Sequence, residues 1–193
     1  MKKIIMLDRL GNNFSLEAEE FKKAGAEFIV TYFKNEDELA DIVKYADVVM
    51  FNDADINEKV INKMEFCKMI IRYGIGYDNV DLHAAAEKGI YVCNAPSYGT
   101  FDVAEHAMAL LLAVCKKIPL SDTCARTGQW DAGRIGKVRR LKDKTIGFVG
   151  FGRIARCVCE RTNAFKMKPV VFDPYVDFDI IEEMGAEKVS FDE

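Results

Sequence analysis

The sequence predicts an α/β protein whose sheets are mostly parallel. Short apolar segments rich in Ile and Val alternate with helical patterns along the whole chain. These segments are continuously apolar, which is typical of strands covered on both faces. Near residue 150 a glycine-rich turn joins one such segment to a helix. With 193 residues, 50% hydrophobic and 30% charged, the chain has room for one large domain or two small ones.

Residues 1–97 are predicted to form a small α/β domain. Five segments are expected as its strands: Ile4–Leu7, Phe28–Thr31, Val48–Phe51, Met69–Arg72 and Tyr91–Cys93. Asn35 and Glu38 form a capping pattern for a helix over Glu36–Tyr45, and Asp81 is expected to cap a short helix that ends before Gly89. Parallel strands separated by helices, in a domain of this size, indicate a flavodoxin-like arrangement.

A second domain is expected over residues 98–193, and it begins with a long helix, Thr100–Lys117. The second half of this helix, Met108–Val114, is apolar on nearly all sides, which predicts burial between two bodies. Pro119 is expected to end the helix, and a polar stretch containing Trp130 follows. Because so small a monomer would leave these apolar residues uncovered, we expect a two-fold dimer built on residues 100–118.

The next segment has the order of a dinucleotide-binding βαβ unit. An apolar run, Thr145–Val149, meets the turn GFGRIA at residues 150–155, and a helical segment follows. A second apolar run, Val170–Phe172, then ends on Asp173. This order predicts a Rossmann-type unit that binds NAD. The alternative is an ordinary strand–turn–helix in which Asp173 is a chance acid at a strand end.

Each position in this unit has a physical role in dinucleotide binding. Gly150 permits the tight turn, and Gly152 lets backbone N–H groups approach a pyrophosphate at the positive end of the helix. Ala155 is small enough for close packing of helix on strand. Asp173 can accept hydrogen bonds from the adenosine ribose and would repel a 2′-phosphate, so NAD is favoured over NADP.

After this unit the sequence predicts one helical segment, Ile180–Met184, and a short strand, Lys188–Ser190. A dinucleotide-binding domain normally has about six strands. The prediction is therefore an incomplete Rossmann-type domain in a C-terminally truncated chain.

Composition excludes several other classes of function. The net charge of −4, with both signs interspersed, predicts neither a nucleic-acid surface nor a membrane surface. The apolar run before Asp8 is too short for a signal peptide, so a cytoplasmic location is expected. The cysteines are scattered and are predicted to be reduced. Asp102 and His106 stand four apart on the long helix and could share a metal, but a surface pair is favoured and no metal site is predicted.

Four stretches of the chain carry a resemblance to a known family. They are IIRYGIGYDNVD at residues 70–81; Asn94-Ala95-Pro96 with Thr100 and Val103-Ala104-Glu105; Arg126, Gly128 and Trp130; and Gly147 through Pro174. From about Met69 onward the chain resembles the D-2-hydroxyacid dehydrogenases, which include D-lactate, glyoxylate/hydroxypyruvate and 3-phosphoglycerate dehydrogenases. Residues 1–68 fit in length and pattern but carry no motif of their own.

The resemblance implies roles for particular residues. The backbone N–H groups of Ile75 and Gly76 would bind a substrate carboxylate, and Arg72 would face an anionic substrate. A simple turn at Ile75 and Gly76, and a solvated strand-end arginine at Arg72, are the alternatives. The cofactor residues would be Thr100, Gly150, Gly152, Arg153, Ile154, Asp173 and Pro174. Thr100 is also expected to cap its helix, and Asn94–Pro96 matches the family's hinge between domains.

The implied activity is NAD-dependent oxidoreduction at the CH–OH group of a D-2-hydroxy acid. The family's catalytic arginine, glutamate and histidine match no residue here, so this chain alone is expected to be inactive. One alternative is a non-catalytic NAD-binding or dimerisation module derived from the family. A more distant one is a flavodoxin-like regulatory domain in residues 1–97, for which Asp8 and Asp53 are too few acids.

Overall fold

The computed structural model describes all residues from Met1 to Glu193. The chain divides into two compact units, Met1–Ser97 and Tyr98–Glu193. Each unit has its own sheet and its own buried core, so each is described by itself.

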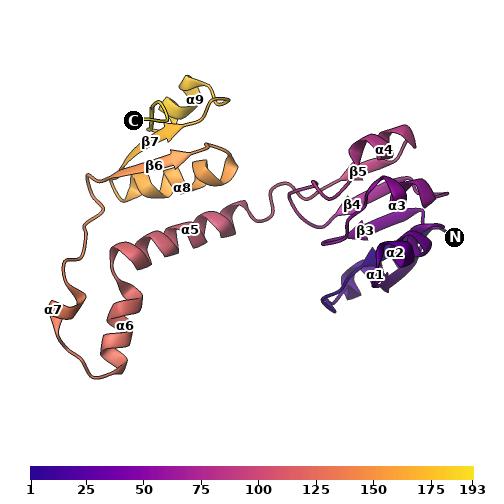
Figure 1. The fold of residues 1–193 in the computed structure, drawn as a ribbon, viewed down its shortest axis with the longest axis horizontal. Helices are drawn as coiled ribbons and strands as arrows, with labels where there is room; N and C mark the ends of the chain where they lie inside the picture. The colour runs from indigo at the N-terminus through magenta and orange to yellow at the C-terminus, as the bar shows by residue number, and fades with distance from the viewer. The chain divides into compact units, whose positions relative to one another are not determined.

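The first unit contains a five-stranded parallel sheet with the order β2-β1-β3-β4-β5 (Figure 1). The strands are β1 (Lys3–Leu7), β2 (Glu27–Thr31), β3 (Val48–Phe51), β4 (Met69–Arg72) and β5 (Tyr91–Cys93). This is the flavodoxin-like order, in which the carboxyl ends of all five strands meet at one edge of the sheet. The α/β class and the flavodoxin-like arrangement predicted from sequence are confirmed.

Four helices connect the strands of the first unit: α1 (Ser15–Lys23), α2 (Glu36–Val43), α3 (Glu58–Lys63) and α4 (Leu82–Glu87). The side chain of Asn35 caps α2 by accepting from Glu38 N at 3.0 Å, as predicted, although the helix ends before Tyr45. Asp81 caps α4 through Ala84 N at 2.9 Å. Gly89 follows α4 with a φ of 65°, a conformation that favours glycine.

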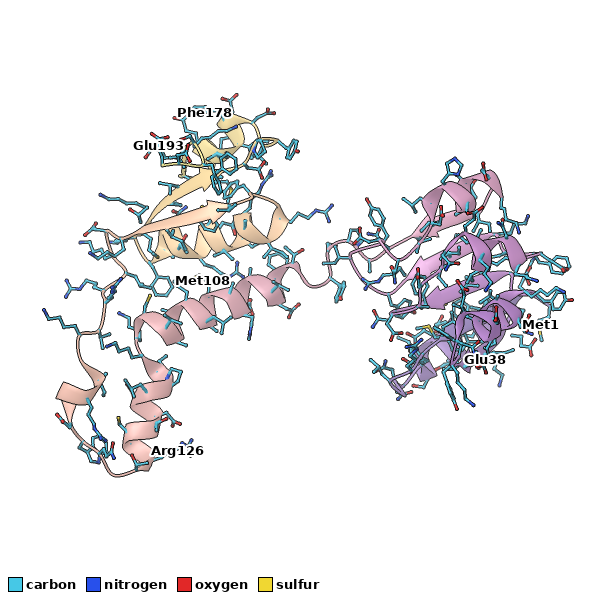
Figure 2. All side chains as sticks on the ribbon, in the orientation of Figure 1. Met1, Glu38, Met108, Arg126, Phe178 and Glu193 are labelled. Carbon is cyan, nitrogen blue, oxygen red and sulfur yellow. The ribbon has the colours of Figure 1, made fainter.

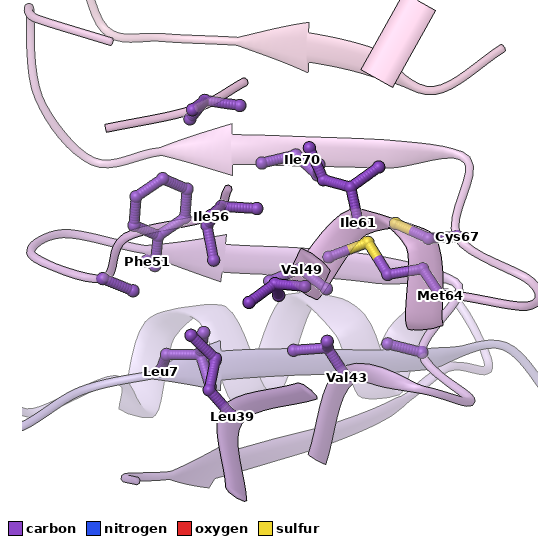
Figure 3. Close-up of a cluster of buried hydrophobic side chains, with 14 of the residues drawn as sticks. Leu7, Leu39, Val43, Val49, Phe51, Ile56, Ile61, Met64, Cys67 and Ile70 are labelled. Atoms are coloured by element: carbon purple, nitrogen blue, oxygen red, sulfur yellow. The ribbon is translucent and has the colours of Figure 1, made fainter. Parts of the chain in front are cut away.

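The core of the first unit lies between its sheet and the helices on one face. Apolar side chains of α2 and α3 interlock there with those of β1, β3 and β4 (Figure 3). The fully buried members include Val43, Val49, Phe51, Ile61 and Ile70. A smaller cluster on the opposite face packs β1 and β3 against residues of α1. Both faces are therefore covered, which explains why the strands are continuously apolar.

The second unit begins with three helices: α5 (Thr100–Cys115), α6 (Ile118–Arg126) and α7 (Ala132–Ile135). A three-stranded parallel sheet follows with the order β6-β7-β8. Its elements are β6 (Thr145–Val149), α8 (Arg153–Ala164), β7 (Lys168–Phe172), α9 (Phe178–Glu183) and β8 (Glu187–Lys188). The unit therefore holds the predicted βαβ order, β6-α8-β7.

Two local predictions about the helices were wrong. Pro119 does not end the long helix; α5 stops at Cys115, and Pro119 lies in the first turn of α6, where its missing N–H costs no helical hydrogen bond. Lys117 makes the break between the two helices with a left-handed φ of 53°. Thr100 is the first residue of α5 rather than its cap, which is Gly99.

Helix α5 packs against α8 along one side only. Ala104 and Met108 of α5 contact Val158 of α8, and the Met108 side chain lies between the two helices (Figure 2). On its other side Leu110 and Val114 are 54% and 75% exposed. The expected burial of this helix on nearly all sides is therefore not met within the chain.

Strand β6 is one of the two edge strands of the second sheet, and its Val149 is 79% exposed. The exposed Trp130 lies between α6 and α7 in the same unit. No helix anywhere in the chain is long and apolar enough to cross a membrane.

Candidate functional site

The glycine turn lies between the end of β6 and the start of α8. Gly150 has a φ of 90°, a conformation that L side chains rarely adopt. Gly152 is the extended N-cap of α8, and the first helical hydrogen bond runs from Arg156 N to Gly152 O at 3.0 Å. The first turn of α8 contains no acidic residue, and no side chain caps it. The positive end of the helix dipole is therefore available to an anion.

Phe151, between the two glycines, anchors the turn in the core. Its side chain is fully buried with those of Cys159, Val171 and Ile181. Its ring also meets Phe148 edge-on at 5.8 Å between centroids. The turn is thus fixed at its middle residue, while the glycines on either side remain exposed.

Asp173 follows β7, and its carboxylate is tied to this turn. One oxygen accepts from Phe151 N at 2.7 Å; the other accepts from Tyr175 N at 2.8 Å and Val176 N at 3.1 Å. The bond from the Phe151 N–H, followed by that from Tyr175, lowers the pKa of Asp173 below its ordinary value. The carboxylate is therefore charged, and it is 9% exposed. Sequence reasoning did not identify these backbone contacts.

The geometry around Gly152 fits a dinucleotide. A Cβ built on Gly152 would meet nothing within 4 Å, and its φ of −74° suits any residue, so the chain's own packing does not require glycine there. The Gly152 N–H has no acceptor within the chain. An open space beside a free N–H group and a helix N-terminus is the arrangement that a pyrophosphate needs.

The other predicted cofactor residues occupy different surroundings. The Ile154 side chain packs into the cluster between α5 and α8, so only its backbone could face a ligand. Arg153 is the exposed first residue of α8, and the exposed Pro174 follows Asp173. Thr100 is buried at the start of α5.

A second group of free backbone donors follows β4 in the first unit. The loop is held by its carbonyls: Gly74 O accepts from Ala95 N at 2.9 Å, and Ile75 O accepts from Asn94 Nδ2 at 2.7 Å. The N–H groups of Ile75 and Gly76 have no acceptor within the chain. This is an arrangement of free amides on a fixed loop, which suits a small anion such as a carboxylate. Asn94, for which the family resemblance implies a place in a hinge, holds this loop.

Arg72 ends β4 and lies across the same loop. Its Nε donates to Asn52 O at 3.2 Å, and its guanidinium passes over Gly74 so closely that a Cβ there would collide with it. A side chain at Gly74 would therefore require the arginine guanidinium to move. The remaining N–H groups of the guanidinium have no acceptor within the chain, which leaves them available to an anion.

The aromatic residues of this loop differ in burial. The Tyr73 hydroxyl donates to Glu17 at 3.3 Å, and burial raises its pKa. Its ring packs edge-on against Phe14. Tyr77 is exposed.

Neither histidine lies in a protected site. His83 Nδ1 lies 3.7 Å from Glu87 on the surface of α4, where both side chains are largely exposed. His106 is exposed on α5, and no three His, Cys, Asp or Glu side chains gather as metal ligands.

Residues 4–189 match the family described as "D-isomer specific 2-hydroxyacid dehydrogenase, catalytic domain". The chain belongs to this family. It is 38% identical over 190 residues to a D-3-phosphoglycerate dehydrogenase of Methanocaldococcus jannaschii, a match that covers 98% of this chain and 35% of that protein. The chain thus spans about a third of the length of the D-3-phosphoglycerate dehydrogenases that it matches.

Solved structures of related enzymes share the fold. An acyclic imino acid reductase in complex with NADPH and D-Arg is 29% identical, with a TM-score of 0.83 over 97% of this chain and 60% of the other. An NAD-dependent formate dehydrogenase from Staphylococcus aureus in complex with NAD is 28% identical, with a TM-score of 0.79 over 98% of this chain and 61% of the other.

Proposed function

We propose that this chain binds NAD and serves the interconversion of a D-2-hydroxy acid and its 2-oxoacid. The observation that carries the proposal is the turn at Gly150–Gly152, which is bonded through Phe151 to Asp173 at the N-terminus of α8. In this proposal residues 98–193 bind the cofactor and residues 1–97 bind the substrate.

NAD rather than NADP is supported by the charge at the end of β7. Asp173 is ionised and carries its negative charge where the adenosine ribose would lie, so a 2′-phosphate would be repelled. The formate dehydrogenase solved with NAD is consistent with this choice, whereas the imino acid reductase was solved with NADPH. The nicotinamide, when bound, would supply the hydride acceptor, with Thr100 close to it.

The substrate contacts are proposed on the loop after β4. The free N–H groups of Ile75 and Gly76 would hold the carboxylate that all 2-hydroxy acids share. Arg72 would then meet a second anionic group of the substrate with its free guanidinium N–H groups. A phosphorylated or dicarboxylic substrate suits this pair of sites better than a neutral side chain does.

These residues provide no acid–base group for the proton transfer that the reaction requires. Efficient acid–base catalysis by a histidine needs an oriented partner and a substrate within hydrogen-bond reach. The His83–Glu87 pair is on an exposed helix surface, and His106 has no bonded partner. We therefore infer that the chain alone binds cofactor weakly and does not transfer hydride.

A second candidate is a non-catalytic NAD-binding or dimerisation module. The exposed apolar residues Leu110, Val114 and Trp130 favour association, and we propose a homodimer that covers them. Six free cysteines, among them the exposed Cys93, fit a reducing cytoplasmic location.

Titration calorimetry with NADH, NADPH and ADP-ribose tests the cofactor site. The proposal predicts that NADH and ADP-ribose bind and that NADPH binds at least tenfold more weakly. Equal affinity for NADH and NADPH would refute the role of Asp173, and no binding of either would refute the cofactor site. A chain extended with the family's histidine-bearing region could bind NADH and still show no turnover. That result would favour the non-catalytic module.

A further inference from the structure

Arg156 reaches back from α8 to the glycine turn. Its side chain is half-buried, and its Nε donates to the carbonyl oxygen of Phe151 at 3.0 Å. Its guanidinium also lies over the Phe151 ring, 5.8 Å from the centroid. The backbone N–H group of Phe151 donates to the carboxylate of Asp173. Both backbone polar groups of Phe151 are therefore held by charged side chains, one from α8 and one from the end of β7.

Holding this carbonyl also fixes a neighbouring donor. The C=O of Phe151 and the N–H of Gly152 belong to one planar trans peptide, so they point in opposite directions. When Arg156 holds the carbonyl on one side, the Gly152 N–H must point to the other. That N–H has no acceptor within the chain, and the space beside Gly152 is open.

The turn needs such a restraint because of its own composition. Glycine at positions 150 and 152 places no Cβ on either side of Phe151, so side-chain sterics do not hold the peptide plane in one orientation. The buried Phe151 ring fixes the position of the residue. A rotation of the following peptide would move mainly the carbonyl and the Gly152 N–H, and that carbonyl is the atom that Arg156 bonds.

We propose that Arg156 is a positioning residue for the pyrophosphate of the cofactor, acting through the Phe151–Gly152 peptide rather than by touching the phosphates. The inference rests on the proposed NAD site and adds a residue that the glycine pattern does not include. Asp173 acts on the preceding peptide plane, so the two side chains orient consecutive peptides of one turn.

The test compares Arg156→Met and Arg156→Lys with the native chain. Methionine keeps the length of the side chain without a donor, and lysine keeps the charge without the Nε geometry. Arg161→Met is the matched control, because Arg161 lies on the same helix and bonds Cys157 O and Glu105 instead of the turn. Thermal unfolding of each variant establishes that it is folded.

Two measurements carry the test. Calorimetry gives the Kd of ADP-ribose and of adenosine, which lacks the pyrophosphate. Amide NMR of the free protein reports the Gly152 N–H. For Arg156→Met we expect about a tenfold higher Kd for ADP-ribose, unchanged adenosine binding and a displaced or broadened Gly152 signal. Arg156→Lys should lose most of the same affinity, while Arg161→Met should match the native chain.

The other outcomes overturn the inference in distinguishable ways. If the native chain binds no ADP-ribose, the proposed cofactor site fails and Arg156 loses its role with it. If the native chain binds and Arg156→Met binds equally well, only the positioning role fails. Full affinity in Arg156→Lys with an unchanged Gly152 signal in Arg156→Met would mean direct phosphate contact. Equal losses for adenosine and ADP-ribose would mean a general structural role.

Discussion

The two glycines of the turn are required for different physical reasons. Gly150 is fixed by its backbone, whose φ of 90° strains any residue with a Cβ. Gly152 is unstrained and has free space beside it, so its lack of a side chain matters only if a ligand fills that space.

Replacing these glycines should therefore separate stability from binding. We expect Gly152→Val to abolish detectable binding of ADP-ribose while changing the unfolding temperature little. Gly150→Ala should instead destabilise the fold by roughly 1–3 kcal/mol, the cost of an unfavourable backbone conformation. Calorimetry and thermal unfolding of both variants check this, and retained binding in Gly152→Val would contradict a pyrophosphate at this turn.

Asp173 has two proposed roles, holding the turn and binding the ribose. Asp173→Ala should raise the Kd of NADH by about ten- to a hundredfold. The N–H donors of the turn and the ribose hydroxyls of the cofactor would both lose the carboxylate as their hydrogen-bond acceptor. Asp173→Asn is the control, since its amide oxygen can still accept from Phe151 N while its charge is gone. If the carboxylate repels NADPH, this variant should bind NADPH more tightly relative to NADH than the native chain does.

The lowered pKa of Asp173 also makes stability depend on pH. Its carboxylate is stabilised in the folded state by N–H donors, so it contributes to stability above its ordinary pKa of 3.8. That contribution should disappear as the pH falls below 3.8 and through the lowered folded value. Urea unfolding of the native chain and of Asp173→Asn should therefore differ at neutral pH and converge in acid. A difference in unfolding free energy between the native chain and Asp173→Asn that stays constant from neutral pH into acid would argue against the N–H contacts to Asp173.

At the scale of elements, α5 and α6 carry apolar residues that the chain does not cover. Val114→Asp should shift the chain from dimer to monomer in sedimentation at micromolar concentration, because a charge would be desolvated at the interface. Leu16→Asp on α1 is the control, since Leu16 is similarly exposed in the first unit. A monomeric native chain that remains folded would count against the proposed homodimer.

Elements with a simple local cause were predictable from the sequence. Strands β3, β4 and β5 have the predicted bounds because apolar runs between turn residues leave little choice of conformation. Pro119 was misread because proline both follows one helix and begins another, and only the left-handed Lys117 locates the break. Helix α6 was missed for the same reason.

The parts of the candidate site that are formed by residues close together in the sequence were predictable, and the other parts were not. The turn of GFGRIA and the acid after the next strand can be read from spacing. The bond from Arg156 to Phe151 O follows from the helical path of α8, and the bond from Asn94 to Ile75 O joins loops after two neighbouring strands. The Asn94 contact depends on tertiary geometry, because its two residues are 19 apart in the sequence, and it leaves no pattern in the order of residues.

At the scale of the whole molecule, the expected result for the chain alone is binding without chemistry. We expect no loss of the nicotinamide absorbance of NADH with glyoxylate, hydroxypyruvate, pyruvate or 3-phosphohydroxypyruvate, even at high protein concentration. Turnover that survives purification and disappears in Gly152→Val would show this expectation to be wrong. His83→Ala and His106→Ala would then identify which histidine supplies the proton.

The sheet of the first unit has a consequence for how the protein is made. All five of its strands, including both edge strands β2 and β5, come from Met1–Ser97, and its main core cluster extends from Ile5 to Ile90. Residues 98–193 contribute no strand to this sheet and no side chain to this core cluster. Because domains fold as units while synthesis proceeds from the N-terminus, the first unit can be native on the ribosome before the glycine turn has been translated. The nascent cofactor-binding segment would then emerge beside a partner that is already folded.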